Sequence, residues 1–108
     1  MTPGHVGIDA RSEIRGEETW IHVEGELDHD GCGQVAPVLL RAEGAGPVVV
    51  DMSGVTFVSS EGIGLMLRAH RKRREEGRTL LLSGLRPHIR RSFEIVGVFE
   101  VVPECKLA

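Results

Sequence analysis

One stretch of sequence decides the fold of this chain: Val48-Val49-Val50-Asp51-Met52-Ser53-Gly54-Val55-Thr56-Phe57-Val58-Ser59-Ser60-Glu61-Gly62-Ile63-Gly64-Leu65-Met66. Its apolar start predicts a strand at residues 48–52 that is buried on both faces. Gly62 and Gly64 allow the helix that follows to lie close against the sheet. Ser59 and Ser60 therefore stand where a buried strand gives way to a helix.

Ser60 is expected at or beside the N-cap of that helix. Unpaired backbone N–H groups and the positive end of the helix dipole attract an oxygen acceptor at this place and tolerate a phosphate. Position alone favours a plain capping role, because serine is a preferred cap residue. The hydroxyl is thus either a cap or a site of modification.

Composition and the start of the chain indicate a single soluble domain in the cytoplasm. The chain has 108 residues, 41% hydrophobic and 27% charged, which is the profile of one globular domain. We expect residues 1–108 to form that domain, with a core over about 6–104 and flexible ends. The start lacks a basic segment followed by an apolar one, and no apolar run has membrane-spanning length. The sequence therefore predicts no membrane insertion.

Cysteine and histidine spacing predicts neither a metal nor another cofactor. Cys32 and Cys105 belong to no C-x-x-C pair, so a disulfide framework or a cysteine zinc site is not expected. The five histidines are scattered, and none forms an H-x-x-x-H or H-E-x-x-H pair. The two thiols are interpreted as reduced bystanders.

Charge is unevenly distributed along the chain. Residues 1–50 hold nine acidic and three basic side chains, whereas residues 51–108 hold seven acidic and ten basic ones. The run Arg71-Lys72-Arg73-Arg74 is interpreted as a solvated helix end, where cations complement the helix dipole. Nucleic acid is not the expected partner, because the chain has one tryptophan, three phenylalanines and no tyrosine for stacking.

Hydrophobic periodicity predicts strands and helices in alternation, which is the pattern of an α/β domain with helices laid over a mixed sheet. Gly77 is the expected stop of the long helix, and Pro37 is expected in the first turn of the helix that contains it. Connectors are expected at 26–30 and 54–59. The predicted strands are 6–11, 19–25, 48–52, 79–83 and 99–102, the last as a strand or extended segment, and the predicted helices are 33–43, 60–76 and 87–95.

No catalytic residues are predicted, and the chain is not expected to be an enzyme. His70 lies on the apolar stripe with Ile63, Met66 and Leu67, and we expect its ring to pack while its nitrogens bond to a carbonyl group. Ser60 cannot use His70 as a base, because ten residues of helix rise about 15 Å. The chain also lacks a G-x-S-x-G elbow, a P-loop ending and a complete dinucleotide fingerprint.

The segment from Asp51 to Gly64 resembles the signature of anti-sigma factor antagonists, which are bacterial single STAS domains. Gly25-Glu26-Leu27-Asp28 matches the turn that follows the second strand in that family. The resemblance covers about residues 19–104. It implies a mixed β-sheet of four to five strands packed with three to four helices.

The resemblance also implies a switch. In the family, the unphosphorylated antagonist binds an anti-sigma factor that is also an ATP-dependent serine-protein kinase, and so releases a sigma factor. Phosphorylation breaks this complex and a phosphatase restores it. The phosphorylated serine maps onto Ser60, with Ser59 as the alternative, and Asp28 has a supporting role or is simply a turn residue. The implied partner-binding residues are Asp28, Ser59, Ser60, Glu61, Gly62 and Ile63.

Two departures and two alternative functions accompany this resemblance. The family commonly has Asp where this chain has Ser59, and Ser, Thr or Ala where it has Glu61.

STAS domains also serve as unmodified subunits of lipid-transporting ABC ATPases and of stress-signalling scaffolds. A monomer or weak dimer is expected if the chain is an antagonist.

Overall fold

Four strands form one mixed sheet in the order β1-β2-β3-β4. The computed structural model describes residues 8–104. β1 and β2 pair antiparallel, whereas β2 with β3 and β3 with β4 pair in parallel. The strands are β1 (Ile8–Arg15), β2 (Glu18–Leu27), β3 (Val48–Val58) and β4 (Leu80–Ser83). The α/β class and the mixed sheet predicted from the sequence are confirmed.

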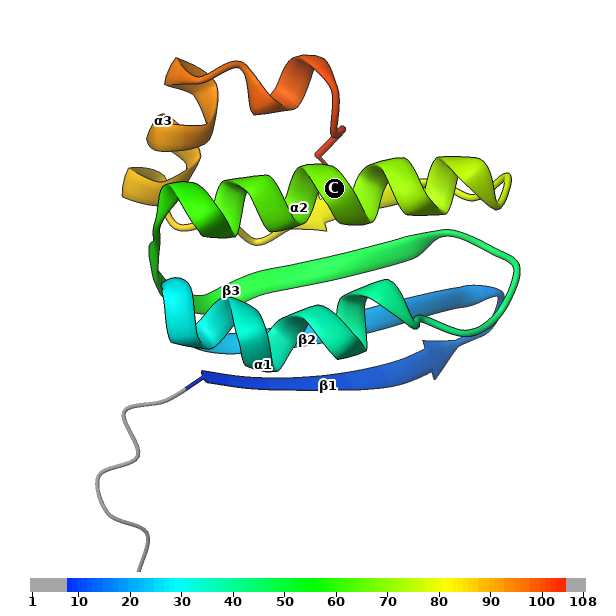
Figure 1. Cartoon of the computed structure of the whole chain (residues 1–108). Helices are drawn as coiled ribbons and strands as arrows, with labels where there is room; N and C mark the ends of the chain where they lie inside the picture. Colours follow the sequence, from blue (N-terminus) through cyan, green and yellow to red (C-terminus); the bar gives the residue numbers. More distant parts are fainter. Residues whose placement is uncertain (1–7, 105–108) are drawn as a thin grey trace, which may run out of the picture.

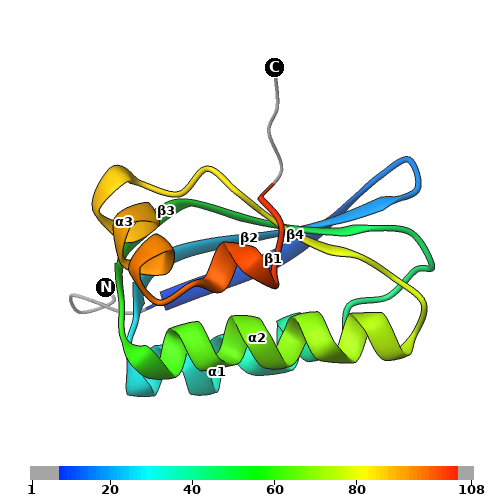
Figure 2. The same cartoon turned by 90° about the horizontal axis from the view of Figure 1, so that it is seen from above.

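Two helices cover one face of the sheet, and a third lies at its β4 edge (Figures 1 and 2). α1 (His29–Leu40) and α2 (Ser60–Glu75) lie side by side on the covered face. α3 (Pro87–Ile95) and the 3-10 helix η1 (Val98–Glu100) lie beside β4 (Figure 1). In residues 8–104, no helix combines the length and the apolar character that crossing a membrane requires.

The core forms where the covered face of the sheet meets the helices. Val48, Val50 and Met52 of β3 are fully buried in this core. Val49 points to the other face and is also buried, with 1% of its surface exposed. The prediction that this strand is buried on both faces is therefore confirmed. Because β3 ends at Val58 and α2 begins at Ser60, this buried strand leads directly into the serine turn.

The expected connector at 54–59 is wrong for most of its length, because β3 continues to Val58. Its parallel pairing with β2 extends past two register shifts, to Gly25 with Val55 and Leu27 with Val58. A side chain at Gly54 would collide with Glu24, since an added Cβ would lie 2.6 Å from the Glu24 Cγ atom. Close approach of the two strands thus requires a glycine in the middle of β3.

The helix expected at 33–43 begins four residues earlier, at His29. β2 runs to Leu27, so the expected connector at 26–30 shrinks to the single residue Asp28 between strand and helix. Asp28 is the N-cap, and its Oδ1 atom accepts the N–H of Gly31 at 2.8 Å. Pro37 consequently lies inside α1 and not in its first turn, which corrects that prediction.

Four other predicted features show where local sequence patterns succeed and where they fail. α3 spans the predicted residues, opened by Pro87. Gly77 follows the end of α2 with φ 75°, as expected of a helix stop. The extended segment predicted at 99–102 is wrong, because η1 forms there after Gly97 turns the chain with φ 75°. The first strand extends to Arg15, beyond its predicted end, and the part predicted before residue 8 lies outside the described residues.

The basic run at 71–74 is only partly solvated, contrary to the prediction. Arg73 is fully buried, and its guanidinium donates to the carbonyl groups of Leu40 and Ala42 at 3.0 and 3.2 Å. It also pairs with Glu76 at 3.1 Å. Arg73 follows Ala69 by four residues on the buried stripe of α2, so helical periodicity carried the signal. The buried positions of α2 are Gly62, Leu65, Met66, Ala69, His70 and Arg73.

Candidate functional site

Ser59 is the N-cap of α2, with extended backbone angles of φ −86° and ψ 175°. Its Oγ atom accepts the N–H of Gly62 at 3.3 Å and donates to the carbonyl oxygen of Leu27 at 3.2 Å. The Ser59 backbone N–H donates to the same carbonyl at 3.1 Å. Ser59 therefore joins the start of α2 to the end of β2, and its half-buried hydroxyl has a structural role.

Ser60 follows as the first residue of α2, and its side chain is exposed. The capping hydrogen bonds of this turn belong to Ser59, so Ser60 lies beside the N-cap, within the range that the sequence predicted. A phosphate at Ser60 would lie near the N–H groups of the first helical turn, which carry partial positive charge.

Asp28 and Ser59 cap neighbouring helices at the same end of the molecule. Asp28 caps α1, Ser59 caps α2, and the carbonyl of Leu27, the residue before Asp28, receives both hydrogen bonds from Ser59. The starts of α1 and α2 therefore form one surface (Figure 1). Of the two interpretations of Asp28, the local backbone bond is present in the structure.

An ion pair links the first turns of the two helices. The ring Nδ1 of His29 lies 2.7 Å from Glu61 Oε2, and both side chains are exposed. The pKa of His29 is raised above its usual value, mainly by the hydrogen bond that its ring donates to the Glu61 carboxylate and secondly by the negative charge of Glu61. Sequence analysis missed His29, because the 32 residues that separate it from Glu61 conceal the contact.

Gly62 and Ile63 lie deeper than Ser60 and Glu61. Gly62 is buried, and an added Cβ would lie 2.7 Å from Val58 Cγ1 and 2.8 Å from the Leu27 carbonyl oxygen. Ile63 is half-buried and packs against the core. These two residues hold α2 against the sheet, so Ser60 and Glu61 are the exposed members of the predicted site on α2.

A pocket of about 500 Å³ adjoins this surface. Cys32 lines it from α1, while Glu61 and the basic side chains of Arg68 and Arg71 line it from α2. Burial, followed by the nearby acidic charges, raises the pKa of the Cys32 thiol, so the thiol stays protonated. The pocket gives the candidate site a concave flank with both signs of charge.

A second polar cluster lies on the sheet, where His22 stands between two carboxylates. Its ring nitrogens lie 2.7 Å from Glu13 Oε1 and 2.8 Å from Asp51 Oδ2. Trp20 stacks on the His22 ring with the centroids 6.1 Å apart. Burial acts to raise the pKa of Asp51, but hydrogen bonds from Ser53 and His22 outweigh it and lower that pKa. The cluster joins β1, β2 and β3.

His70 does not make the carbonyl bond that the sequence predicted. The ring is buried, with 7% exposed, but neither nitrogen has a hydrogen-bond partner in residues 8–104. Burial, followed by the charge of Arg74, lowers the pKa of His70. In the same range of residues, no group of three or more histidine, cysteine or carboxylate side chains is arranged to hold a metal ion.

The chain is similar in sequence to curated proteins that are described as anti-sigma factor antagonists. An anti-sigma-B factor antagonist of Staphylococcus epidermidis is 29% identical over 84 residues, which cover 76% of this chain and 78% of the relative. BtrV of Bordetella bronchiseptica is 34% identical over 56 residues, 52% of this chain. The chain spans about half the length of BtrV, 48%.

Solved structures share the fold. The phosphorylated form of the Bacillus cell fate determinant SpoIIAA superposes with a TM-score of 0.64 at 21% identity, over 91% of this chain and 92% of SpoIIAA. A family model described as "Mlab, STAS domain" matches residues 10–103, nearly all of the chain. With the mixed sheet, the paired helices and the serine turn before α2, this match shows that the chain belongs to the STAS domain family.

Proposed function

We propose that this chain is an anti-sigma factor antagonist that is switched by phosphorylation of Ser60. One observation carries the proposal: the two adjacent serines have different surroundings. Ser59 uses its hydroxyl to cap α2 and to bond Leu27, whereas Ser60 is exposed on the first turn of the helix. A kinase that reaches this turn meets the Ser60 hydroxyl without having to break the helix cap.

The proposed partner is an anti-sigma factor that is also a serine-protein kinase. Binding of the unmodified chain releases a sigma factor, and a phosphatase restores the chain after phosphorylation. The Staphylococcus epidermidis relative, itself an anti-sigma-B factor antagonist, supports this assignment through similarity over 76% of the chain. The proposed contact surface includes Ser60 and Glu61 directly, with Asp28, Ser59, Gly62 and Ile63 positioning or flanking them.

Phosphorylation would act through charge and solvation. A phosphoserine adds roughly −1.5 to −2 charges and three acceptor oxygens at neutral pH. The helix N-terminus stabilises that charge in the free protein, but a closely packed partner would have to desolvate it. A penalty of about 3 kcal/mol corresponds to a loss of affinity of roughly a hundredfold. The fold need not change for this switch to operate.

Glu61 sharpens the proposed recognition, because a carboxylate already stands beside the acceptor hydroxyl. Its side chain is 57% exposed even while paired with His29. We expect an Arg or Lys of the partner opposite Glu61, so that Glu61→Ala weakens binding in the absence of phosphate. Calorimetry that finds equal affinity for Glu61→Ala and the unchanged protein would exclude that contact.

The decisive experiment combines phosphate mapping with binding. Peptide mass spectrometry of the chain from its native cell should find phosphate on Ser60 that is lost in Ser60→Ala. In calorimetry with the cognate anti-sigma factor, Ser60→Ala should bind normally and Ser60→Asp should lose most of its affinity. Ser12→Asp places the same charge on the exposed part of β1 and is the matched control. Normal binding by Ser60→Asp would refute the switch.

A second candidate function is an unmodified STAS subunit of a lipid-transporting ABC ATPase or of a stress-signalling scaffold. The His29–Glu61 pair favours it, because Glu61 departs from the family pattern and occupies the surface next to Ser60. The native chain would then carry no phosphate under any growth condition. It would be recovered with a membrane ATPase, or in a giant particle by size-exclusion chromatography.

A further inference from the structure

The two edges of the sheet differ in what pairs with them. At the β4 edge, the chain returns after η1: the Leu82 N–H donates to the Pro103 carbonyl at 3.0 Å, and Leu82 forms a bridge with Glu104. At the other edge, β1 pairs with β2, and no other segment of residues 8–104 lies along its outer side (Figure 1). Alternate residues of β1 therefore present N–H and C=O groups without a strand partner among the described residues.

β1 carries a row of charges that alternate in sign. Asp9, Arg11, Glu13 and Arg15 occupy every second position, so they lie on one face of the strand. Ile8 belongs to the other set of positions and to the core under the helices, which places the charged row on the face away from α1 and α2. Read from the opposite direction, this row has the opposite sign at each place, so it is complementary to itself in an antiparallel pair.

Half of this row meets no opposite charge within the described part of the chain. On β2, Asp9 lies opposite Glu24, and Arg11 lies opposite His22. Neither the Asp9 nor the Arg11 side chain makes a hydrogen bond or an ion pair with another of residues 8–104. Like charges that lie directly opposite each other destabilise a strand pair. The single chain thus leaves these two charges available to another strand.

The other half of the row has bonding capacity to spare. Glu13 uses one oxygen, Oε1, for both of its contacts, with Arg15 Nη2 at 3.1 Å and with His22 Nε2 at 2.7 Å. Arg15 lies over the Trp20 ring, with its guanidinium carbon 4.2 Å from the ring centroid. The second carboxylate oxygen of Glu13 and the remaining N–H groups of Arg15 can therefore bond to a second chain.

We propose that two copies of this chain pair antiparallel through β1, centred on Ser12, so that their sheets join into one continuous sheet. In this register Arg11 lies opposite Glu13 of the second copy, and Asp9 lies opposite Arg15 of the second copy. The twofold axis repeats each pair. Every charge of the row then faces an opposite charge, and the free N–H and C=O groups of both edges are paired.

The same charges fix the register of the pair. Sliding one strand by two residues places Arg11 opposite Arg11 and Asp9 opposite Glu13. Sliding it the other way places Glu13 opposite Glu13 and Arg11 opposite Arg15. Sliding by one residue turns the charged row of one copy toward the helix face of the other. Only the pairing centred on Ser12 matches the charges along the full length of β1.

Apolar contact and interface size indicate a weak dimer. Ile14 is 65% exposed in the single chain and lies opposite Ala10 of the second copy in this register. Two paired strands of eight residues bury less surface than a standard protein interface. We therefore expect a dissociation constant on the order of 100 µM.

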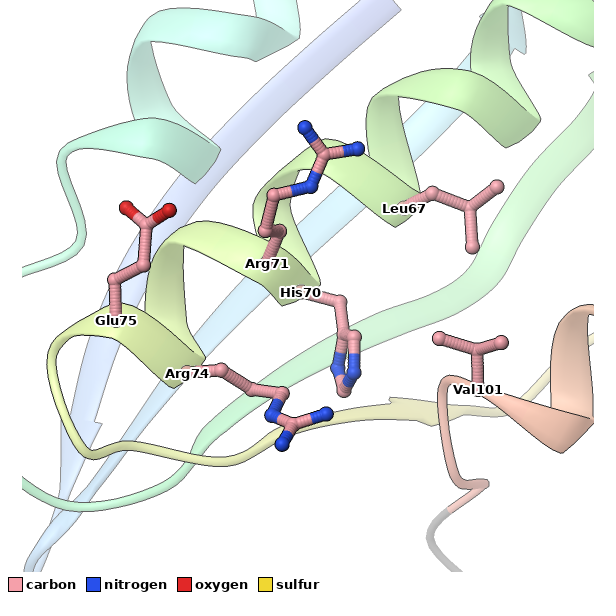
Figure 3. Close-up of a pocket in the computed structure, with 6 residues that line it drawn as sticks. All are labelled: Leu67, His70, Arg71, Arg74, Glu75 and Val101. Carbon is pink, nitrogen blue, oxygen red and sulfur yellow. The ribbon is translucent and has the colours of Figure 1, made fainter.

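The pocket at the far end of α2 is a competing surface for self-association, but its charges do not match. Its volume is about 490 Å³, and Val101, which is 53% exposed, lines it together with Arg71, Arg74 and Glu75 (Figure 3). A twofold contact centred on this pocket brings the basic side chains of two copies together, which opposes binding. At the β1 edge, in contrast, each charge gains an opposite one.

Sedimentation equilibrium of the full chain, from about 10 µM to about 1 mM, tests the dimer. The average mass should rise from 11.8 kDa toward twice that value. Sodium chloride at about 0.5 M should weaken association at least about threefold, because salt screens exposed ion pairs. A chain that remains at 11.8 kDa at the highest concentration, or association that salt leaves unchanged, would overturn the proposal.

Arg11→Glu distinguishes this interface from other contacts. It places a carboxylate opposite Glu13 of the second copy, twice in each dimer, and should raise the dissociation constant at least about tenfold. Adding Glu13→Arg restores opposite signs in the same register and should return the constant to within about threefold of the unchanged chain. Arg91→Glu makes the same charge change on the exposed side of α3 and should alter it less than about twofold. Equal effects of Arg11→Glu and Arg91→Glu would overturn the proposal.

A cysteine at the centre of β1 tests the register without any change of charge. Ser12→Cys places two thiols opposite each other at the twofold axis, where facing Cα atoms lie about 5 Å apart, within the span of a disulfide. Ile14→Cys faces Ala10 of the second copy instead. With Cys105→Ser in both variants, mild oxidation should link the Ser12→Cys chains at least about tenfold faster. Equal rates of linking would refute the register centred on Ser12.

Discussion

The two ends of α2 use charged side chains in opposite ways. At the start, Glu61 pairs with His29 in the open, and both side chains are more than half exposed. At the end, Arg73 is fully buried and Arg78 is 6% exposed, and both bond to backbone carbonyl groups. The first set of charges is accessible to a partner, whereas the second set is occupied by backbone carbonyl groups of the same chain.

The buried arginines replace hydrogen bonds that the chain cannot make locally. α1 ends at Leu40, and the loop from there to β3 leaves carbonyl groups of residues 40, 42, 43 and 46 facing α2. Arg73 and Arg78 donate to all four of these carbonyl groups. Arg73 therefore serves mainly as a donor to backbone carbonyl groups, and its position in the basic run 71–74 conceals that role.

The largest expected effect comes from removing the buried guanidinium group of Arg73 at the end of α2. Arg73→Met keeps much of the volume but removes the donors to Leu40 and Ala42, which leaves the Leu40 carbonyl without this partner while the Ala42 carbonyl keeps only its bond from Arg78. We expect a loss of about 3 kcal/mol in the free energy of unfolding. Urea denaturation of the variant and the unchanged protein would measure this difference in the free energy of unfolding. Lys72→Met, at the exposed neighbouring position, should change stability by less than about 0.5 kcal/mol, and equal losses would contradict the distinction.

The second-largest expected effect comes from crowding the contact between the first turn of α2 and the sheet. Gly62→Ala forces a methyl group against Val58 and Leu27 and should cost about 2 kcal/mol by overpacking. Gly64→Ala is the matched control, because an added Cβ there meets nothing within 4 Å. That control should be stabilising by about 0.5 kcal/mol, since alanine favours helix. Thermal and urea denaturation of both variants should show opposite signs.

A smaller effect separates the two serines. Ser59→Ala removes the N-cap bond to Gly62 and should cost about 1 kcal/mol of stability. Ser60→Ala removes an exposed hydroxyl and should change stability by less than about 0.5 kcal/mol. Partner binding should be insensitive to Ser60→Ala, so stability and regulation are separable. A greater loss of stability in Ser60→Ala than in Ser59→Ala would reverse the roles given to these residues.

The smallest effect concerns the exposed ion pair. Glu61→Gln should lower the pKa of His29 toward its ordinary value, as NMR of the ring signals would show. Glu75→Gln, at the other end of α2, should leave that pKa unchanged. Because folding raises the His29 pKa, the pair stabilises the fold while His29 is protonated, and this contribution disappears as the pH rises through the pKa in the folded protein. The stability difference between Glu61→Gln and the unchanged protein should shrink over that range.

Sequence patterns predicted the elements that depend on neighbours in the chain. The buried Val48–Val50 segment, the glycine after α2 and the proline that opens α3 each contain their own signal. The pattern places the start of α1 too late, because the segment around Asp28 has the composition of a connector, although an aspartate three residues before Gly31 can cap a helix. The length of β3 was missed because its second half has only a weak apolar pattern.

Within the candidate site, the adjacent serines and Glu61 could be identified from the sequence, whereas His29 could not. The contact between His29 and Glu61 joins the starts of two helices, and only the packing of those helices on one sheet brings them to 2.7 Å. The hydroxyl of Ser59 is similarly distinguished from that of Ser60 by the carbonyl of Leu27, 32 residues away. Such contacts depend on the register between β2 and β3.

The sequence by itself determined the alternation of strands and helices, the buried central strand and the serine turn, because periodicity and capping are local properties of a chain. The tertiary structure alone decided which charges are buried, which serine caps α2 and where His70 lies without a partner. Those outcomes depend on distances between segments that are about thirty residues apart, as with Arg73 and the Ala42 carbonyl. A linear pattern contains no such distances, since only the assembled sheet fixes how the helices lie on it.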